Sequence, residues 1–278
     1  MIDSHHYLWA YNAEEYPWVS TDNALAQHYL IPELKKALEP TGITGTVVVQ
    51  ARQCDSETHA LLELSEACEM IRGVVGWLEI AEHEKLDFTL ENYAAHPNFL
   101  GLRHGLEDEP DAFFTQDDFH AGLAILSQHN LTYDLLIFQR QIPVALKLID
   151  RQPKVGFILD HLAKPVLEKG KINPEWKKGM RELAKRDHLR GVKFSGLLTE
   201  FPAEVEPDRA TINAYLHETL AIFGSERVMF ASDWPSCLLR SENYQFWFDL
   251  VTDLAQELSE SEQAALFEKN ATRCYNLV

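Results

Sequence analysis

Basic residues are scarce in this chain: 25 Lys and Arg stand against 43 Asp and Glu, which gives a formal net charge of -18. Such a charge repels polyphosphate, and no stretch rich in Lys or Arg offsets it, so the sequence argues against nucleic acid as a partner. No apolar run approaches the length of a membrane span. The N-terminus also lacks the basic-then-apolar order of a signal peptide, so we expect a cytoplasmic protein with no membrane partner.

Cysteine and phosphate-binding glycine motifs are also sparse or missing. The four cysteines show no C-x-x-C spacing and lie in a long chain rather than a small secreted scaffold, which indicates reduced thiols. Neither G-x-G-x-x-G nor a P-loop pattern occurs. The chain has no fixed-period repeat, low-complexity tract or Gly/Ser-rich or Pro-rich linker, so we expect one domain over residues 1–278.

Hydrophobic residues are plentiful, at 46%, and they form short β-branched-rich runs that alternate with longer stretches of helical periodicity. The predicted strands are Ile2–Trp9, Thr46–Ala51, Gly73–Ile80, Leu100–His104, Tyr133–Phe138, Val155–His161, Gly191–Ser195 and Val228–Ser232. The predicted helices include Ser56–Met70, Asp117–His129, Pro174–Asp187, Asp208–Phe223 and Ser259–Cys274.

Eight strands that alternate with helices predict a parallel sheet closed into a (β/α)₈ barrel. The alternative is an open, doubly wound sheet. That fold normally carries a Gly-rich phosphate turn after an early strand, and this chain has none. The barrel is therefore the favoured architecture.

The carboxyl ends of barrel strands face the active site, so polar residues there are candidate functional groups. The polar residues at these positions are His5, His6, Tyr7, Gln50, Trp77, Glu79, Arg103, His104, Asp160, His161, Lys164, Lys193, Ser195 and Asp233. The two-residue period of a strand puts Asp3, His5 and Tyr7 on one face and Ser4 and His6 on the other. We therefore expect His5 to point into the barrel and His6 to be structural.

Three residues are the leading catalytic candidates. Asp233 ends the last strand, where a general base is expected, and His161 and His5 end the sixth and first strands. Each also has a purely structural interpretation: Asp233 as the cap of a turn, His161 as a core histidine, and His5 as a plug of the barrel bottom.

A second group of residues is suited to holding a sugar-like substrate. Arg103 offers planar, forked donors, although an ion pair with Glu107 or Asp108 would also explain it. Lys164 either orients the substrate or extends over the rim of the barrel. The predicted substrate-binding residues are Tyr7, Gln50, Trp77, Arg103, His104 and Lys164.

Other polar residues at the strand ends are expected to be structural. Asp160 has the opposite strand parity to His161 and is predicted to bond backbone or a neighbouring helix. Ser195 lies in "KFSGL" rather than in a G-x-S-x-G turn, so it is not expected to be a nucleophile. The acidic run Glu107–Asp111 is typical of a solvated loop, with part of a lid as the alternative.

Several motifs along the chain resemble those of one enzyme family. They are, in order, "IDSHHYLW", "VVVQA", "GVVGW", "GLRHGLEDEPD", "YDLL", "LDHLAKP", "KFSGLLTE" and "FASDWP". Their order and spacing are similar to those of the amidohydrolase-2 branch of the amidohydrolase superfamily, and within it to fuconolactonases and pyrone-dicarboxylate lactonases. The resemblance implies a distorted (β/α)₈ barrel that hydrolyses a cyclic ester, with the strand-8 aspartate, Asp233, activating water.

Tyr7 is the departure from this family pattern, because it replaces the second histidine of H-x-H. His5, His161 and Asp233 are left as ligands for any metal, since a neutral phenol with a pKa near 10 is a poor ligand at neutral pH. We therefore expect that no cofactor is strictly required and that any divalent metal, such as Zn²⁺, binds weakly.

The function predicted from the sequence is the hydrolysis of a small lactone, in particular a sugar aldonolactone. Two alternatives stay open: a non-oxidative decarboxylase of an aromatic or muconate-type acid, and a non-catalytic protein that binds sugar acids. A small molecule is the expected partner, and homo-oligomers are compatible with the sequence.

Overall fold

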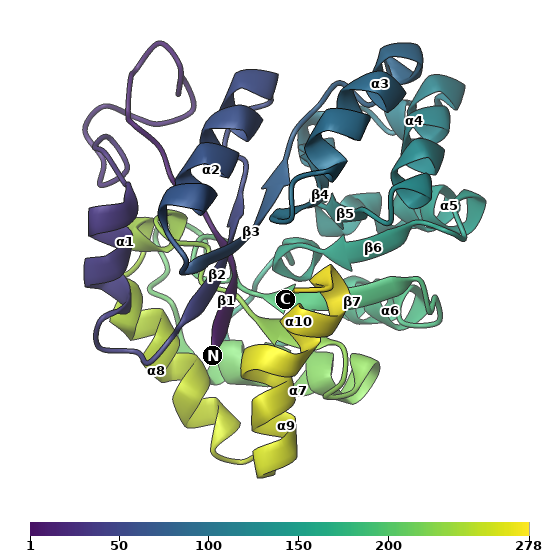
Figure 1. Ribbon diagram of the computed structural model, residues 1–278. Helices are drawn as coiled ribbons and strands as arrows, with labels where there is room; N and C mark the ends of the chain where they lie inside the picture. Colours follow the sequence, from purple (N-terminus) through teal and green to yellow (C-terminus); the bar gives the residue numbers. More distant parts are fainter. Residues whose placement is uncertain (278) are drawn as a thin grey trace.

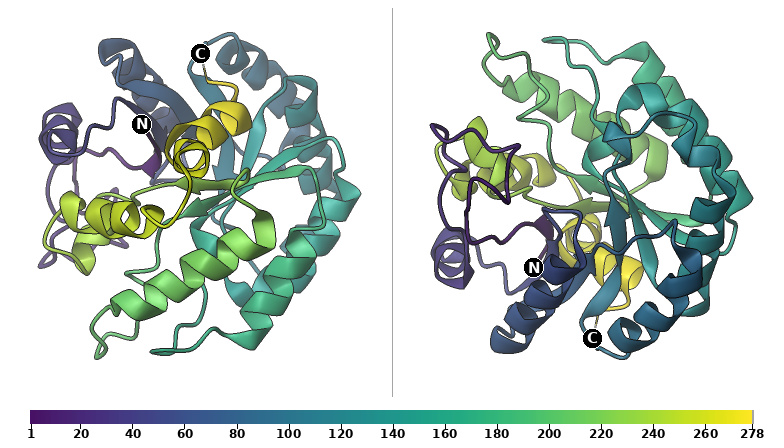
Figure 2. Two further views of the ribbon diagram at one scale, coloured as in Figure 1. Left: turned by 90° about the horizontal axis from the view of Figure 1, so that it is seen from below. Right: turned by 90° about the horizontal axis from the view of Figure 1, so that it is seen from above.

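The computed structural model describes residues 1–277, and its central feature is one sheet of eight parallel strands in the order β1 to β8 (Figure 1). The strands are β1 (Ile2–His6), β2 (Gly45–Val49), β3 (Ile71–Gly76), β4 (Phe99–His104), β5 (Thr132–Leu135), β6 (Gly156–Leu159), β7 (Leu189–Phe194) and β8 (Val228–Phe230). The sheet curls into a barrel with helices outside it, as the two end views in Figure 2 show. The predicted (β/α)₈ barrel is therefore confirmed.

Successive strands are connected by α1 (Ile31–Leu38), α2 (Asp55–Ala67), α3 (His83–Ala94), α4 (Asp117–Gln128), α5 (Ile142–Arg151), α6 (Pro174–Leu183) and α7 (Arg209–Phe223). β8 is followed by α8 (Tyr244–Ala255), α9 (Glu260–Ala264) and α10 (Asn270–Tyr275). Side-chain caps fix several starts: Asn173 for α6, Asp208 for α7 and Ser259 for α9 each accept backbone N–H bonds. Within residues 1–277, no helix is long and apolar enough to cross a membrane.

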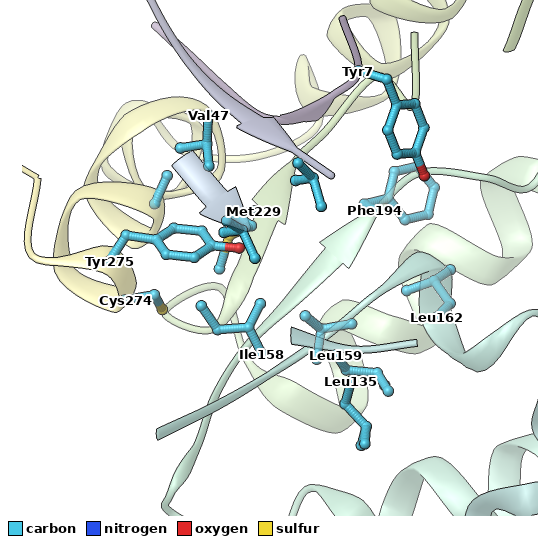
Figure 3. Close-up of a cluster of buried hydrophobic side chains, with 14 of the residues drawn as sticks. Tyr7, Val47, Leu135, Ile158, Leu159, Leu162, Phe194, Met229, Cys274 and Tyr275 are labelled. Carbon is cyan, nitrogen blue, oxygen red and sulfur yellow. The ribbon is translucent and has the colours of Figure 1, made fainter. Parts of the chain in front are cut away.

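The barrel interior is packed with apolar side chains from the strands. β2 is buried along its whole length, which explains its continuous "GTVVV" sequence. Figure 3 shows Val47, Ile158 and Met229 in this core. Full burial of each such side chain contributes about 1.5–3 kcal/mol to stability.

The barrel is distorted where its first and last strands meet. A register shift between Asp3 and His6 interrupts the pairing of β1 with β2. β1 joins the chain after β8 through an isolated bridge between His6 and Trp234 and a bond from the Asp233 N–H to the His5 carbonyl, at 2.9 Å. The Asp3 carboxylate accepts from the backbone N–H and hydroxyl of Ser232. We call this junction the β1–β8 seam.

The seam corrects one prediction about side-chain direction. Asp3 does not share a face with His5 and Tyr7, because its carboxylate bonds Ser232 and the Tyr244 hydroxyl on α8. The register shift between Asp3 and His6 breaks the two-residue alternation on which the prediction depended. His5 and Tyr7 do point the same way.

The C-terminal helices close the amino-terminal end of the barrel, where they appear in yellow in Figure 2. Tyr275 of α10 enters the interior, and its hydroxyl donates to Asp134 of β5 at 2.7 Å. The opposite end, at the carboxyl ends of the strands, carries long connections such as residues 7–30. The predicted helix Ser259–Cys274 is confirmed, although a π-helical turn at Ala265–Lys269 separates α9 from α10.

The predicted strands all correspond to observed strands, but several end too late in the prediction. The first ends at His6 rather than Trp9, and the sixth at Leu159 rather than His161. Leu8, Trp9 and Ile137 remain buried beyond their strands because connecting segments pack over the rim. The hydrophobic sequence therefore continues past the last residue that is hydrogen-bonded in the sheet, which is why the predicted strands end too late. Helices α1, α3, α5 and α8 were not among the named predictions.

Candidate active site

A cavity of about 710 Å³ opens at the carboxyl ends of the strands. Six predicted site residues line it: Tyr7, Gln50, Arg103, His161, Lys164 and Asp233. His5 lies directly beneath, fully buried, with its ring 4.5 Å from that of His161. The structure therefore brings together all three predicted catalytic residues.

Trp77 and His104 lie elsewhere, outside the residues that line the cavity. The Trp77 indole donates to His104 Nδ1 at 3.0 Å, and His104 Nε2 lies 2.9 Å from Glu109. His104 also stacks on Phe113. Strand alternation explains this placement, because Arg103 points into the barrel and its neighbour must point out. The structure gives these two predicted substrate-binding residues a packing role instead.

A left-handed turn aims His161 at the cavity. The four residues from His161 to Lys164 all have positive φ, a conformation that L residues adopt rarely. The turn lets consecutive residues Asp160 and His161 both face the site. His161 Nδ1 lies 2.8 Å from the Ser195 hydroxyl, which fixes the ring. Gly196, at φ +74°, has no room for a Cβ, which would lie 2.7 Å from His161 Cβ.

Asp233 sits at the junction of the seam and the cavity. It also has positive φ (57°), and its carboxylate lies 3.7 Å from His161 Nε2. Burial raises its pKa to about 8, while the charges of Lys164 and Arg103 and a hydrogen bond from Tyr7 act against that rise. Burial lowers the pKa of His161 to about 3, so this imidazole is neutral. Asp233 is thus the group in the cavity that titrates near neutral pH.

Arg103 organises the floor of the cavity. Its guanidinium donates to the Tyr7 hydroxyl at 3.2 Å, to Asp160 at 3.3 Å and to the Gln50 carbonyl. Burial raises the pKa of Tyr7, so its phenol keeps its proton and donates to Asp233. The alternative interpretation of Arg103, an ion pair with Glu107 or Asp108, is wrong: its carboxylate partner is Asp160.

A buried ion cluster lies beneath the cavity. Lys193 donates to Asp134 at 2.5 Å and to His5 Nδ1 at 2.9 Å, and it lies 2.9 Å from Asp160. Lys193 and its charged neighbours hold the pKa of Asp160 well below its usual range, against the effect of burial. Burial raises the pKa of Asp134 to about 6. Asp160 thus belongs to the site, and the prediction that it bonds backbone or a neighbouring helix is wrong.

Lys193 was among the polar strand-end residues of the sequence, but the prediction gave it no role in the site. Its signal was available, because Lys193 and Ser195 share a face of β7 and a lysine inside a barrel strand must have buried partners. Asp160 gave a signal too, because it lies two residues after the inward-facing Ile158, whereas the turn that brings His161 to the site cannot be deduced from strand alternation.

Whether these residues suit a divalent metal depends on what already contacts their ligand atoms. One ligand atom each from His5, Asp160 and His161 lies within 4.8 Å of the others. However, Lys193 and Arg103 already face two of the three residues: both nitrogens of His5 and both oxygens of Asp160 lie 2.9–3.3 Å from one of these two cations. A divalent ion would lie against two fixed positive charges. The donor set therefore does not fit a tightly held metal.

Ion pairs surround the mouth of the cavity. Lys164 donates to Glu107 at 2.6 Å and lies 3.9 Å from Glu200, and Arg52 lies 3.1 Å from Glu15. Trp18 is half exposed and also lines the mouth. Sequence position alone does not reveal Glu200, Arg52 or Trp18, because all lie in connections rather than at strand ends.

A buried carboxyl group with a pKa near neutrality, beside a neutral imidazole at the carboxyl end of a (β/α)₈ barrel, is suited to general acid–base chemistry. A sequence model of the Amidohydrolase family matches residues 2–277. The chain belongs to this family, so the predicted family and the prediction of an enzyme are both confirmed.

Characterised relatives cover the whole chain. An L-fucono-1,5-lactonase of Burkholderia multivorans is 35% identical over 99% of this chain and 96% of its own length. An L-fucono-1,5-lactonase of Burkholderia ambifaria is 27% identical over 99% and 95%. A crystal structure of an amidohydrolase from Burkholderia multivorans with bound zinc superposes with a TM-score of 0.92, at 35% identity, over 100% of this chain and 99% of that one.

Proposed function

We propose that the protein hydrolyses a sugar aldonolactone, with Asp233 activating the attacking water. The observation that carries the proposal is the Asp233 carboxyl group, which is buried at the cavity wall with a pKa of about 8. A general base works best when its pKa lies near the working pH. The similarity to lactonases over the full chain supports the choice of a lactone as substrate.

The proposed reaction uses neighbouring groups in sequence. Asp233 removes a proton from water, which attacks the lactone carbonyl carbon. Arg103 stabilises the resulting oxyanion by donating hydrogen bonds, and the single O–H of Tyr7 turns to the oxyanion once Asp233 is protonated and no longer needs it. The bond between the carbonyl carbon and the ring oxygen then breaks, and protonated Asp233 returns its proton to that oxygen. The product is an open-chain hydroxy acid, which ionises to an aldonate.

Cavity chemistry disfavours the two alternative functions. An aromatic acid decarboxylase would need an apolar, aromatic-lined pocket, whereas five carboxyl groups and three cations line this one: Glu15, Glu107, Asp108, Glu200, Asp233, Arg52, Arg103 and Lys164. A protein that only binds sugar acids has no use for a buried carboxyl group whose ionisation costs stability.

A substrate screen tests the proposal. We expect a pH-indicator assay to detect hydrolysis of at least one neutral lactone among L-fucono-1,5-lactone, L-rhamnono-1,4-lactone and L-galactono-1,4-lactone, because the cavity offers many hydrogen-bonding groups. A parallel assay should detect no CO₂ release from dihydroxybenzoates. Release of CO₂ with every lactone inert would replace this proposal with the decarboxylase.

Metal removal should have little effect. We expect the purified protein to carry well under one equivalent of metal and to keep most of its activity after chelation, because Lys193 and Arg103 occupy the potential ligands. The ligands predicted from the sequence for a weakly bound zinc were His5, His161 and Asp233, whereas the ligand atoms that lie close together belong to His5, Asp160 and His161. Tyr7→Phe should lower turnover about tenfold or more through loss of a donor, whereas Tyr7→His should raise zinc occupancy.

Elemental analysis before and after chelation, beside activity measurements, checks this expectation. One full equivalent of zinc, with activity lost on its removal and regained on its return, would show that the two cations do not prevent metal binding.

The pH dependence of kcat/KM should follow the ionisation of Asp233. Because burial raises its pKa to about 8, the carboxyl group is protonated below that pH and cannot accept a proton from water. We expect kcat/KM to rise about tenfold per pH unit below this value and to level off above it. Initial rates, corrected for spontaneous lactone hydrolysis, measure the profile. A flat profile between about pH 5 and about pH 8 would exclude a base with a raised pKa.

A further inference from the structure

Every cation that lines the cavity, among the described residues, is already paired with a carboxylate. Arg103 pairs with Asp160, and Arg52 with Glu15. Lys164 faces two carboxylates, Glu107 and Glu200. The cavity therefore has no unpaired positive charge to offer an anionic ligand.

The group formed by Lys164, Glu107 and Glu200 is built into the wall. Side-chain exposure is only 22%, 17% and 16%, respectively, so the solvent screens these charges weakly. The left-handed turn that places His161 also places Lys164, whose ammonium lies 4.9 Å from the centre of the Phe138 ring. The charge of Lys164 also reaches Asp233, whose pKa it lowers. Lys164, Glu107 and Glu200 therefore line the same cavity as Asp233.

Two carboxylates around one ammonium make a poor anion site but a good site for hydroxyl groups. The carboxylate oxygens accept from sugar hydroxyls, and Lys164 donates to a hydroxyl or ring oxygen. A ligand carboxylate in the same place would meet two like charges, which costs binding free energy.

We infer that Glu107 and Glu200 are specificity-determining residues that select a neutral, polyhydroxylated lactone and repel its own anionic product. This inference deepens the proposed function and rests on it for the identity of the reaction. Hydrolysis turns a neutral ring into an aldonate, so the same two carboxylates that hold substrate hydroxyls favour release of the product. Lactones that carry a carboxylate are excluded for the same reason.

Direct binding tests the inference without relying on turnover. Isothermal titration calorimetry would measure the Kd of the wild-type protein for L-fuconate, an anion, and for L-fucitol, a neutral polyol of the same size. We expect Glu107→Gln and Glu200→Gln each to shift the ratio of the two Kd values about tenfold in favour of L-fuconate, since each removes one nearby negative charge. In kinetic assays the same variants should show stronger inhibition by L-fuconate.

Glu218→Gln is the matched control. Glu218 is also 17% exposed, lies 2.7 Å from Lys177 and is outside the residues that line the cavity. Its ratio of Kd values should equal that of the wild type. Melting temperatures check that each variant is folded, and Lys164→Gln provides a second test because it should shift the ratio toward L-fucitol.

The outcomes separate the inference from the proposed function. An unchanged ratio in both glutamate variants, or an equal shift in Glu218→Gln, would overturn the inference even if lactones are hydrolysed. A shifted ratio in a protein that hydrolyses no lactone would support the charge selection and refute the proposed reaction.

Discussion

Asp233→Asn is expected to lower kcat/KM by about 10²–10⁴-fold, the usual cost of losing a general base. Asparagine keeps the shape of the side chain and can still accept the hydrogen bond from Tyr7, but it cannot take a proton from water. The remaining activity should no longer rise with pH toward about 8, because the titrating group is gone. Steady-state kinetics on the best lactone of the screen measure both effects.

The same substitution should stabilise the fold at alkaline pH. The folded-state pKa of about 8 lies above the ordinary value of 3.8, so the folded protein holds this proton more tightly than the unfolded chain. Asp233 therefore costs no stability at acid pH and progressively more as pH rises from about 4 to about 8. Each pKa unit corresponds to about 1.4 kcal/mol, so the variant should gain a few kcal/mol over the wild type at pH 9.

Thermal or urea unfolding at acid and alkaline pH tests this sign. A variant that keeps more than half of its turnover would remove Asp233 from the mechanism. A variant that loses activity and is also less stable at pH 9 would indicate that Asp233 is a structural cap.

Lys193→Met is expected to be the most destabilising single change in the site. It leaves Asp134 and Asp160 buried without their shared cation, and removal of one partner of a buried ion pair costs about 3–5 kcal/mol. The melting temperature should fall by about 10 °C. Turnover should fall as well, because His5 and Asp160 lose the ammonium that positions them.

Two further variants interpret that result. Lys193→Met combined with Asp134→Asn should recover part of the lost stability, since one buried negative charge is removed with the positive one. Lys177→Met, at a partly exposed pair on the outer surface, should cost less than about 1 kcal/mol. Equal losses for Lys193→Met and Lys177→Met would contradict a special role for the buried cluster.

The fold could be predicted because its signals are repeated along the chain. Short β-branched runs such as "TVVV" recur between helical segments, and their number and order are enough to favour a barrel. The ends of the strands were harder to predict. Leu8 and Ile137 are buried by packing beyond the strands, and their hydrophobicity is the same as that of residues buried within a strand.

The site could be predicted in part for the same kind of reason. His5, Arg103 and Asp233 follow from strand ends alone. His161 and Lys164 were predicted from their position after the sixth strand, but the run of positive φ angles that directs them is not required by any residue in "DHLAKP". Strand alternation predicts that His104 points away from Arg103, so its placement among the substrate-binding residues disregarded a signal that the sequence contained.

The β1–β8 seam has a consequence for how the protein acquires activity. The backbone partner of His5, Asp233, is made more than two hundred residues after it, and Tyr275 later still. Contacts of such long sequence separation form slowly, because the chain must first lose the entropy of a very long loop. His5 and Asp233 therefore come together only after β8 has been made, so a chain that still lacks β8 has no complete site.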